Sequence, residues 1–165
     1  MKPRTPAISS SPDDVLRLAV RFLAHRDRTV AQVQLFLTSR GVSPLQAKHA
    51  IRRLSDLHYL DDAAYAQRHV EKRLASRPMG QERLKAELQA KGIDDRLAEH
   101  VVANVFREMD EEAVAQRALK SAQRHGRKLT SMQVARLLHQ RGFTETTIDH
   151  IIGHDEMKKE WAHEE

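Results

Sequence analysis

The sequence predicts an all-α protein built from three tandem three-helix repeats that form an elongated, curved array. The main observation is a triplet of a basic residue, a glycine and an apolar residue, found three times at intervals of 51 and then 50 residues: Arg40-Gly41-Val42, Lys91-Gly92-Ile93 and Arg141-Gly142-Phe143. Apolar residues also keep their distance from each glycine: Val33, Leu84 and Val134 lie eight residues before it, Leu37, Leu88 and Leu138 four before it, and Ile51, Val102 and Ile152 ten after it. Such a period, made only of helical patterns, indicates repeated supersecondary units.

The first repeat has the pattern of three short helices. Ser11 and the acidic residues after it favour a helix start, and apolar residues follow at helical spacing to about His25: Leu16, Ala19, Val20 and Leu23. Thr29 can cap a second helix that ends at Gly41 and turns Val33 and Leu37 inward, with Val30 beside them. Ser43 and Pro44 begin a third helix, whose inward residues are Ala47, Ile51 and Leu54.

The other two repeats follow the same pattern, and no segment has a convincing strand pattern. The predicted helices are Asp61–Arg77, Gln81–Lys91 and Asp94–Met109 in the second repeat, and Asp110–His125, Thr130–Arg141 and Thr144–Ile152 in the third. We therefore divide the chain into a flexible N-terminal arm, three repeats and an acidic C-terminal tail: residues 1–12, 13–60, 61–109, 110–154 and 155–165.

Composition favours a binding protein with a moderately basic surface. The formal net charge is +5, and the last eleven residues hold five acids and two lysines, which leaves +8 on residues 1–154. That surplus suits a nucleic acid or an acidic protein surface, whereas an aromatic content of 4% argues against base stacking as the main binding device. No cysteine is present, and no long apolar run suggests a signal peptide or membrane span, so we expect a cytoplasmic monomer without disulfides.

No pattern in the sequence indicates catalysis, a cofactor or a metal. The acidic pairs Asp13-Asp14, Asp61-Asp62 and Glu111-Glu112 each begin a repeat's first helix, where a carboxylate interacts favourably with free amides, so we interpret them as caps rather than catalytic pairs. His150 and His154 have metal-ligand spacing, but Gly153 is expected to interrupt their helix and no third ligand follows. Phosphate-loop, dinucleotide-binding and zinc-finger patterns are missing. We expect no enzyme and no cofactor.

Basic residues aligned on helix faces are the stronger functional signal. They recur three or four residues apart in the first helix of every repeat: Arg17 and Arg21; Arg68 and Lys72, with Arg73 and Arg77; and Arg117, Lys120 and Arg124. One row in each repeat can form a stripe that contacts a partner or DNA, and Lys85 and Lys91 lie near it in sequence. The alternative is that these residues are only the solvated faces that every surface helix has.

The middle repeat resembles the signature stretch of the bacterial RecX regulatory proteins. The matching residues are Tyr59-Leu60-Asp61-Asp62, Tyr65-Ala66, Val70, Arg73, Gly80, Arg83-Leu84, Glu87-Leu88 and Lys91-Gly92-Ile93. The flanking repeats fit as well, through Arg28-Thr29 and Arg40-Gly41 upstream and Leu138, Arg141-Gly142-Phe143 and Ile148 downstream. The resemblance covers about residues 13–152.

The resemblance implies a helical three-module protein that binds the groove of the RecA recombinase filament. It implies inhibition or tuning of RecA's ATPase, strand-exchange and co-protease activities in recombination and the SOS response, with weaker binding to single- or double-stranded DNA. Under this interpretation Arg68, Lys72, Arg73 and Arg77 make the contacts, through electrostatic complementarity rather than chemistry.

Two other functions stay open at this point. A sequence-specific DNA-binding regulator is one, because the predicted third helix of the first repeat carries Lys48, Arg52 and Arg53 and has the character of a recognition helix. The corresponding helices of the other repeats lack such a run, which argues against this function. A structural adaptor unrelated to DNA is the other, and it is supported only by the repeats themselves.

Overall fold

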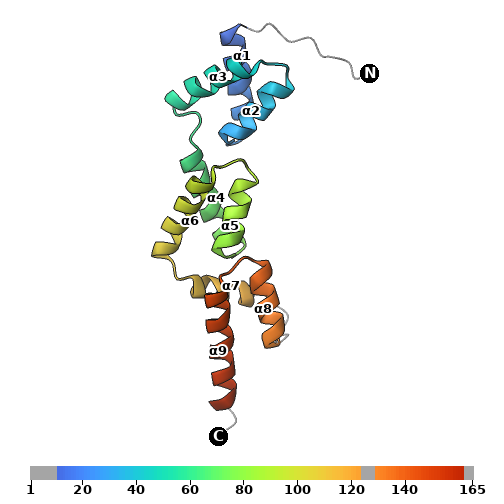
Figure 1. Ribbon diagram of the computed structural model, residues 1–165, viewed down its shortest axis with the longest axis vertical. Coiled ribbons are helices and arrows are strands. Elements are labelled where there is room, and N and C mark those ends of the chain that lie inside the picture. Colours follow the sequence, from blue (N-terminus) through green and yellow to red (C-terminus); the bar gives the residue numbers. More distant parts are fainter. Residues whose placement is uncertain (1–10, 124–128, 162–165) are drawn as a thin grey trace, which may run out of the picture. The chain divides into compact units, whose positions relative to one another are not determined.

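The structure, a computed structural model, describes residues 11–123 and 129–161, with side chains as far as Gly153 in the last helix. These residues form nine α-helices and no strand (Figure 1). In chain order the helices are α1 Pro12–Leu23, α2 Val30–Ser39, α3 Pro44–Asp56, α4 Asp62–Ser76, α5 Gln81–Gln89, α6 Asp95–Glu108, α7 Glu111–Ala122, α8 Ser131–Gln140 and α9 Glu145–Trp161. The predicted fold class, all-α with three consecutive three-helix repeats, is confirmed.

Several helices begin at side chains that the sequence predicts as caps. The hydroxyl groups of Ser11, Thr29, Ser43 and Thr130 each accept a hydrogen bond from the backbone amide three residues later. The side chain at that later position bonds back to the backbone of the cap, which completes a capping box. The helix starts are therefore encoded locally.

The glycine of each triplet ends a helix, as predicted. Gly41, Gly92 and Gly142 have φ angles of 82°, 80° and 74°, in the left-handed region that favours glycine. The amide of Val42, the residue after Gly41, donates to the Leu37 carbonyl at 3.1 Å. The amide of Phe143, the residue after Gly142, donates to the Leu138 carbonyl at 3.2 Å. These bonds are typical of the Schellman termination.

The repeated apolar positions form the buried interior. All six residues that lie eight and four before the glycines are buried: Val33, Leu84, Val134, Leu37, Leu88 and Leu138. The prediction for the first helix needs one correction. Val15, with Ala19, is buried on α1, whereas the expected inward residue Val20 is 37% exposed. The helix is rotated relative to the prediction because Val15 and Ala19, one turn apart, both pack in the core of the first repeat.

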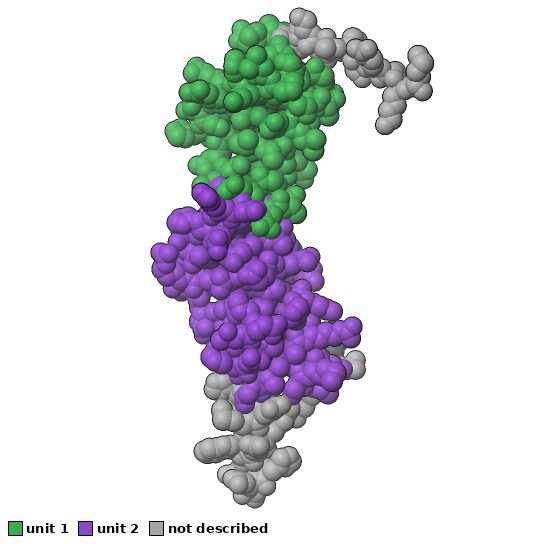
Figure 2. All heavy atoms as spheres, in the orientation of Figure 1, with its two compact units in different colours: residues 1–66, 89–94 green, residues 67–88, 95–165 purple. Residues whose placement is uncertain are grey.

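The chain divides into two compact units, residues 1–66 with 89–94 and residues 67–88 with 95–165 (Figure 2). In unit 1 the turn around Gly92 packs on the start of α2. The Thr29 hydroxyl donates to the Lys91 carbonyl at 2.7 Å, and a Cβ atom on Gly92 would collide with the Cβ of Ala31. Close approach of this turn to α2 therefore requires glycine.

Unit 2 contains the same junction between the second and third repeats. The Gly80 amide donates to the Arg141 carbonyl at 2.9 Å, and the Glu82 amide donates to the Gly142 carbonyl at 3.1 Å. A Cβ atom on Gly142 would collide with the backbone of Arg83. In both units, the glycine turn of one repeat thus docks on the first turn of the preceding repeat's second helix.

Acidic residues at the repeat starts complete these junctions. Asp62 accepts a hydrogen bond from the Val30 amide at 2.9 Å within unit 1. Glu111 accepts one from the Gln81 amide at 3.2 Å within unit 2, together with the hydroxyls of Thr144 and Thr147 at 2.7 Å each. Burial raises the pKa of Asp62, and the bond from Val30 opposes that rise while the charge of Asp61 adds to it.

The predicted capping role of the acidic pairs has direct support in the first two repeats. Asp61 accepts from the Ala64 amide at 2.9 Å. In the third repeat the cap is instead Asp110, which precedes the predicted pair and accepts from the Glu112 amide at 3.0 Å. Asp14 closes the capping box with Ser11. Asp62 and Glu111 differ from the prediction, because each carboxylate accepts a hydrogen bond from the start of the preceding repeat's second helix.

Aromatic rings join the first two helices of repeat 1. The Phe22 and Phe36 rings stack at 4.0 Å between centroids, with the guanidinium of Arg28 4.3 Å from the Phe22 centroid and that of Arg40 5.2 Å from the Phe36 centroid. In repeat 2 the corresponding positions, 51 residues further on, are Arg73 and Glu87. The same backbone position thus carries an aromatic pair in one repeat and an ion pair in the next.

The last helix corrects a second prediction. Helix α9 continues through Gly153 to Trp161, so Gly153 does not end it, and the predicted boundary at residue 154 falls inside a helix. Glycine lowers helix propensity by only about 1 kcal/mol, which the residues on both sides can offset.

Of the predicted N-terminal arm, residues 1–10 lie outside the described residues, while Pro12 already belongs to α1. None of the described helices has the length and apolar character that a bilayer crossing requires.

Candidate partner-binding surface

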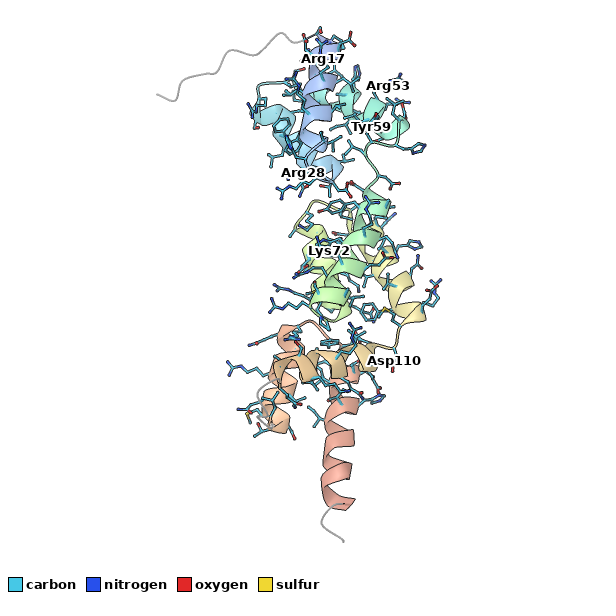
Figure 3. All side chains as sticks on the ribbon, turned by 180° about the vertical axis from the view of Figure 1, so that it is seen from behind. Arg17, Arg28, Arg53, Tyr59, Lys72 and Asp110 are labelled. Carbon is cyan, nitrogen blue, oxygen red and sulfur yellow. The ribbon has the colours of Figure 1, made fainter. Side chains whose placement is uncertain are left out.

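Helix α4 presents the clearest row of basic residues. Arg68 and Lys72 are exposed, whereas Ala66, Val70 and Leu74 on the other side of the helix are buried. Figure 3 labels Lys72 on this helix. The residues that the sequence assigned to the two faces of α4 thus lie on those faces.

Arg73 lies at the edge of this row and has a carboxylate partner. Its Nε and Nη2 atoms donate to the two oxygens of Glu87 on α5, at 2.8 and 2.6 Å. The Nε2 atom of His69 lies 3.2 Å from the same carboxylate. Burial alone would raise the pKa of Glu87, but the bonds from Arg73 and His69 outweigh it and lower the pKa, while Glu87 raises the pKa of Arg73.

A polar pocket of about 250 Å³ opens beside this ion pair in unit 2. The end of α4, helix α5 and the end of α8 supply its walls. Its charged residues are Arg73, Arg77, Arg83, Glu87 and Arg141, a formal excess of three positive charges. The pocket therefore has the character of an anion site.

Arg141 is anchored in this pocket by backbone carbonyls. Its Nη1 atom donates to the carbonyl of Ala118 at 3.1 Å and to that of Pro78 at 3.5 Å. Burial lowers its pKa, and the nearby charge of Arg77 lowers it further. Arg77 and Arg141 thus line the same pocket, and the bonds that fix Arg141 go to neutral carbonyls.

The other predicted contact residues do not gather with these. Arg17 pairs with Asp14 at 2.5 Å and Lys85 pairs with Glu82 at 3.1 Å, both on their own helices. Arg117 is exposed but donates to the Leu74 carbonyl at 3.1 Å, which ties α7 to α4. Arg21 and Lys120 are exposed, Lys91 is half-buried, and Arg124 lies outside the described residues.

The structure also shows where the residues of the DNA-binding and metal-site hypotheses lie. Lys48, Arg52 and Arg53 are exposed on α3, and Figure 3 labels Arg53 there. His150 lies 2.6 Å from Glu112, so this histidine has a carboxylate partner. The side chain of His154 lies outside the described ones, and those that are described contain no group of three metal-ligating residues.

Sequence reasoning missed Arg83 and Arg141 as site residues. Both residues are prominent in the sequence for other reasons: Arg83 belongs to the family signature, and Arg141 belongs to the repeated triplet. Neither shares a helix face with Arg73 and Arg77, so spacing along one helix could not group the four. Their convergence depends on the docking of the Gly142 turn against the start of α5.

This fold and surface define an all-α repeat protein with an exposed basic row on α4. A family model for the second three-helix domain of RecX matches residues 61–102. The regulatory protein RecX of Mycobacterium leprae (strain Br4923) is 30% identical over 151 residues, which cover 89% of this chain and 88% of the relative. The chain therefore belongs to the RecX family of regulatory proteins.

Other relatives agree on the family and the fold. The regulatory protein RecX of Lactobacillus delbrueckii subsp. bulgaricus (strain ATCC BAA-365 / Lb-18) is 37% identical over 121 residues, or 72% of this chain, and the match spans only 44% of that relative's length. The crystal structure of RecX from Lactobacillus salivarius superposes with a TM-score of 0.77 at 24% identity, over 88% of this chain and 97% of the other. That likeness supports the fold.

Proposed function

We propose that the chain binds the RecA recombinase filament on DNA and restrains RecA's ATPase, strand-exchange and co-protease activities. The observation that carries this proposal is membership of the RecX family, shown by the Mycobacterium leprae relative. RecA as the partner comes from the resemblance of the signature residues to that family. The exposed basic row on α4 supplies a surface of the required charge.

In the proposed mechanism the chain acts by binding and does not itself catalyse a reaction. Arg68, Lys72 and Arg77 would meet DNA phosphates or acidic residues of RecA, where electrostatic complementarity increases the rate and specificity of association. A helical module wedged between RecA subunits would hinder the movements that ATP turnover and strand exchange require. One bound chain can then affect several linked subunits.

The direct test measures DNA-dependent ATP hydrolysis by RecA while the chain is added. We expect inhibition with far less than one chain per RecA subunit, and no ATP hydrolysis by the chain alone. Lys72→Glu should weaken inhibition about tenfold, because reversal of an exposed charge replaces attraction with repulsion. Arg107→Glu, at an exposed position near the end of α6, is the matched control and should inhibit like the parent chain.

Two results would count against the proposal. Absence of any inhibition would reject RecA as the partner, and equal inhibition by Lys72→Glu and the parent would remove the α4 row from the interface. The DNA-binding alternative, which the exposed Lys48, Arg52 and Arg53 favour, predicts instead that the chain is retained on naked duplex DNA as well as on RecA-coated DNA.

A further inference from the structure

The arginine pocket of unit 2 contains more positive charge than its one carboxylate can balance. Glu87 uses both oxygens for Arg73, and the Nε atom of Arg83 is 3.9 Å from one of them. Among the described residues that line the pocket, Glu87 is the one carboxylate, and its ion pairs are with Arg73 and Arg83 rather than with Arg77 or Arg141. These two guanidinium groups are therefore the uncompensated charges of the pocket.

The arrangement of the donors suits an anion with several oxygens. A guanidinium has five N–H groups, and Arg141 uses its Nη1 atom for two backbone carbonyls, so donors remain. The carbonyls fix Arg141 in place, which reduces the entropy cost of binding. An anion between Arg77 and Arg141 would also relieve the repulsion between them.

Size and lining distinguish among anions. A volume of about 250 Å³ is several times the roughly 30 Å³ that one water occupies in the liquid, so a hydrated phosphate group fits. The other lining residues include Met79 and Leu137 but no aromatic ring. A base would find no stacking partner there, which favours a phosphate of a nucleic-acid backbone over a base.

The pocket is specific to this part of the chain. In repeat 1 the positions of Arg73 and Glu87 are occupied by the stacked rings of Phe22 and Phe36. A structural role common to all repeats therefore does not explain the arginines, since an aromatic pair fills the corresponding place in the first repeat.

We propose that the pocket formed by Arg73, Arg77, Arg83 and Arg141 binds a single phosphate group. The proposal deepens the proposed function and rests on it only for the source of that phosphate, the backbone of the DNA in the filament. Arginine forks bind phosphate oxygens in pairs, and such charge-assisted bonds are stronger than neutral ones. Glu87 would hold Arg73 in place and limit the affinity through its negative charge.

The test measures phosphate binding to the full chain by calorimetry, at constant ionic strength with chloride as the competing anion. We expect saturable binding of one inorganic phosphate, weakened about tenfold in Arg77→Gln and unchanged in Arg107→Gln. Arg77 and Arg107 are both exposed, so thermal melts should match the parent chain. Glu87→Gln should instead tighten phosphate binding several-fold, a gain that loss of structure would not produce.

Phosphate binding no tighter than chloride binding, or equal phosphate affinity in Arg77→Gln and Arg107→Gln, would overturn the proposal. A second titration uses a single-stranded oligonucleotide with and without free phosphate. Competition supports the backbone as source, whereas binding of free phosphate without competition supports the pocket and assigns it a free phosphate. Inhibition of RecA is measured separately, so failure of the pocket leaves that result intact.

Discussion

Glu87 is the shared carboxylate partner of three residues in unit 2: Arg73, His69 and Arg83. The distances are 2.6 Å to Arg73, 3.2 Å to His69 and 3.9 Å to Arg83, and the Glu87 side chain is 18% exposed. Partial burial raises the pKa of this carboxylate, and the hydrogen bonds from Arg73 and His69 more than offset that rise. Its folded pKa is accordingly lowered, although burial acts in the opposite direction.

This lowered pKa predicts how stability depends on pH. With a folded pKa below the reference value of 4.5, the ionised group stabilises the fold above pH 4.5, and that contribution disappears as the pH falls through the folded pKa. We expect Glu87→Gln to reduce the free energy of unfolding by about 1 to 2 kcal/mol near neutral pH. The difference from the parent chain should shrink as the pH falls toward about 3.

Denaturant unfolding of both proteins across that pH range measures the effect. Glu108→Gln removes an exposed carboxylate from the same unit and serves as the control, with a small difference at every pH. A Glu87→Gln difference that stays constant down to acid pH would mean that the glutamate contributes packing and not charge.

At the scale of elements, the junctions between repeats depend on glycine turns. The turns at Gly92 and Gly142 have positive φ angles, and each brings its glycine against the backbone or Cβ atom of the preceding repeat's second helix. Gly153 offers a contrast inside the same chain, since it is helical and a Cβ atom there would meet nothing within 4 Å.

The two kinds of glycine should respond oppositely to alanine. Gly142→Ala introduces a strained φ angle, which costs about 1 to 2 kcal/mol, and a collision with Arg83, so we expect a loss of more than about 2 kcal/mol. Gly153→Ala should gain up to about 1 kcal/mol, because alanine favours a helix interior. Thermal and denaturant melts of both variants measure these changes.

Equal effects of the two substitutions would contradict the close packing of the Gly142 turn. Destabilisation by Gly153→Ala would contradict the continuation of α9 through that residue. Circular dichroism supplies an independent check, since Gly153→Ala should keep or raise the helical signal.

At the scale of the whole molecule, the repeats share a backbone plan and differ in surface chemistry. Repeat 1 joins its first two helices through stacked rings, and repeat 2 joins them through an ion pair beside a basic pocket. With a net charge of +5 and a negative C-terminal segment, the positive charge available to a partner lies on residues 1–154.

Salt should therefore weaken binding to a RecA filament on DNA. The logarithm of the binding constant should fall linearly with the logarithm of the salt concentration. For Lys72→Glu the slope should be shallower, by about 0.7 to 0.9 for each phosphate that the variant no longer neutralises. Titrations of labelled filament at several salt concentrations give this slope, with Arg107→Glu as control. Identical slopes for both variants would place Lys72 away from DNA.

The sequence by itself determined the features that depend on short-range spacing. Caps such as Thr29, the glycine turns and the buried positions around Leu37 and Leu88 could be predicted because each depends on residues within about ten positions. The architecture could be predicted as well, because the same local pattern recurs at intervals of 51 and 50 residues. The signature residues of the middle repeat indicated the RecX family, which the relatives show.

Only the tertiary structure decided which distant groups meet. Thr29 bonds to Lys91 across 62 residues and Arg141 to Pro78 across 63, and nothing in the local pattern around any of these residues specifies the partner. Helix propensity and capping act within a few turns, whereas these contacts arise when one repeat docks on another. The arginine pocket is a consequence of that docking, because its cations come from segments that approach only in the folded chain.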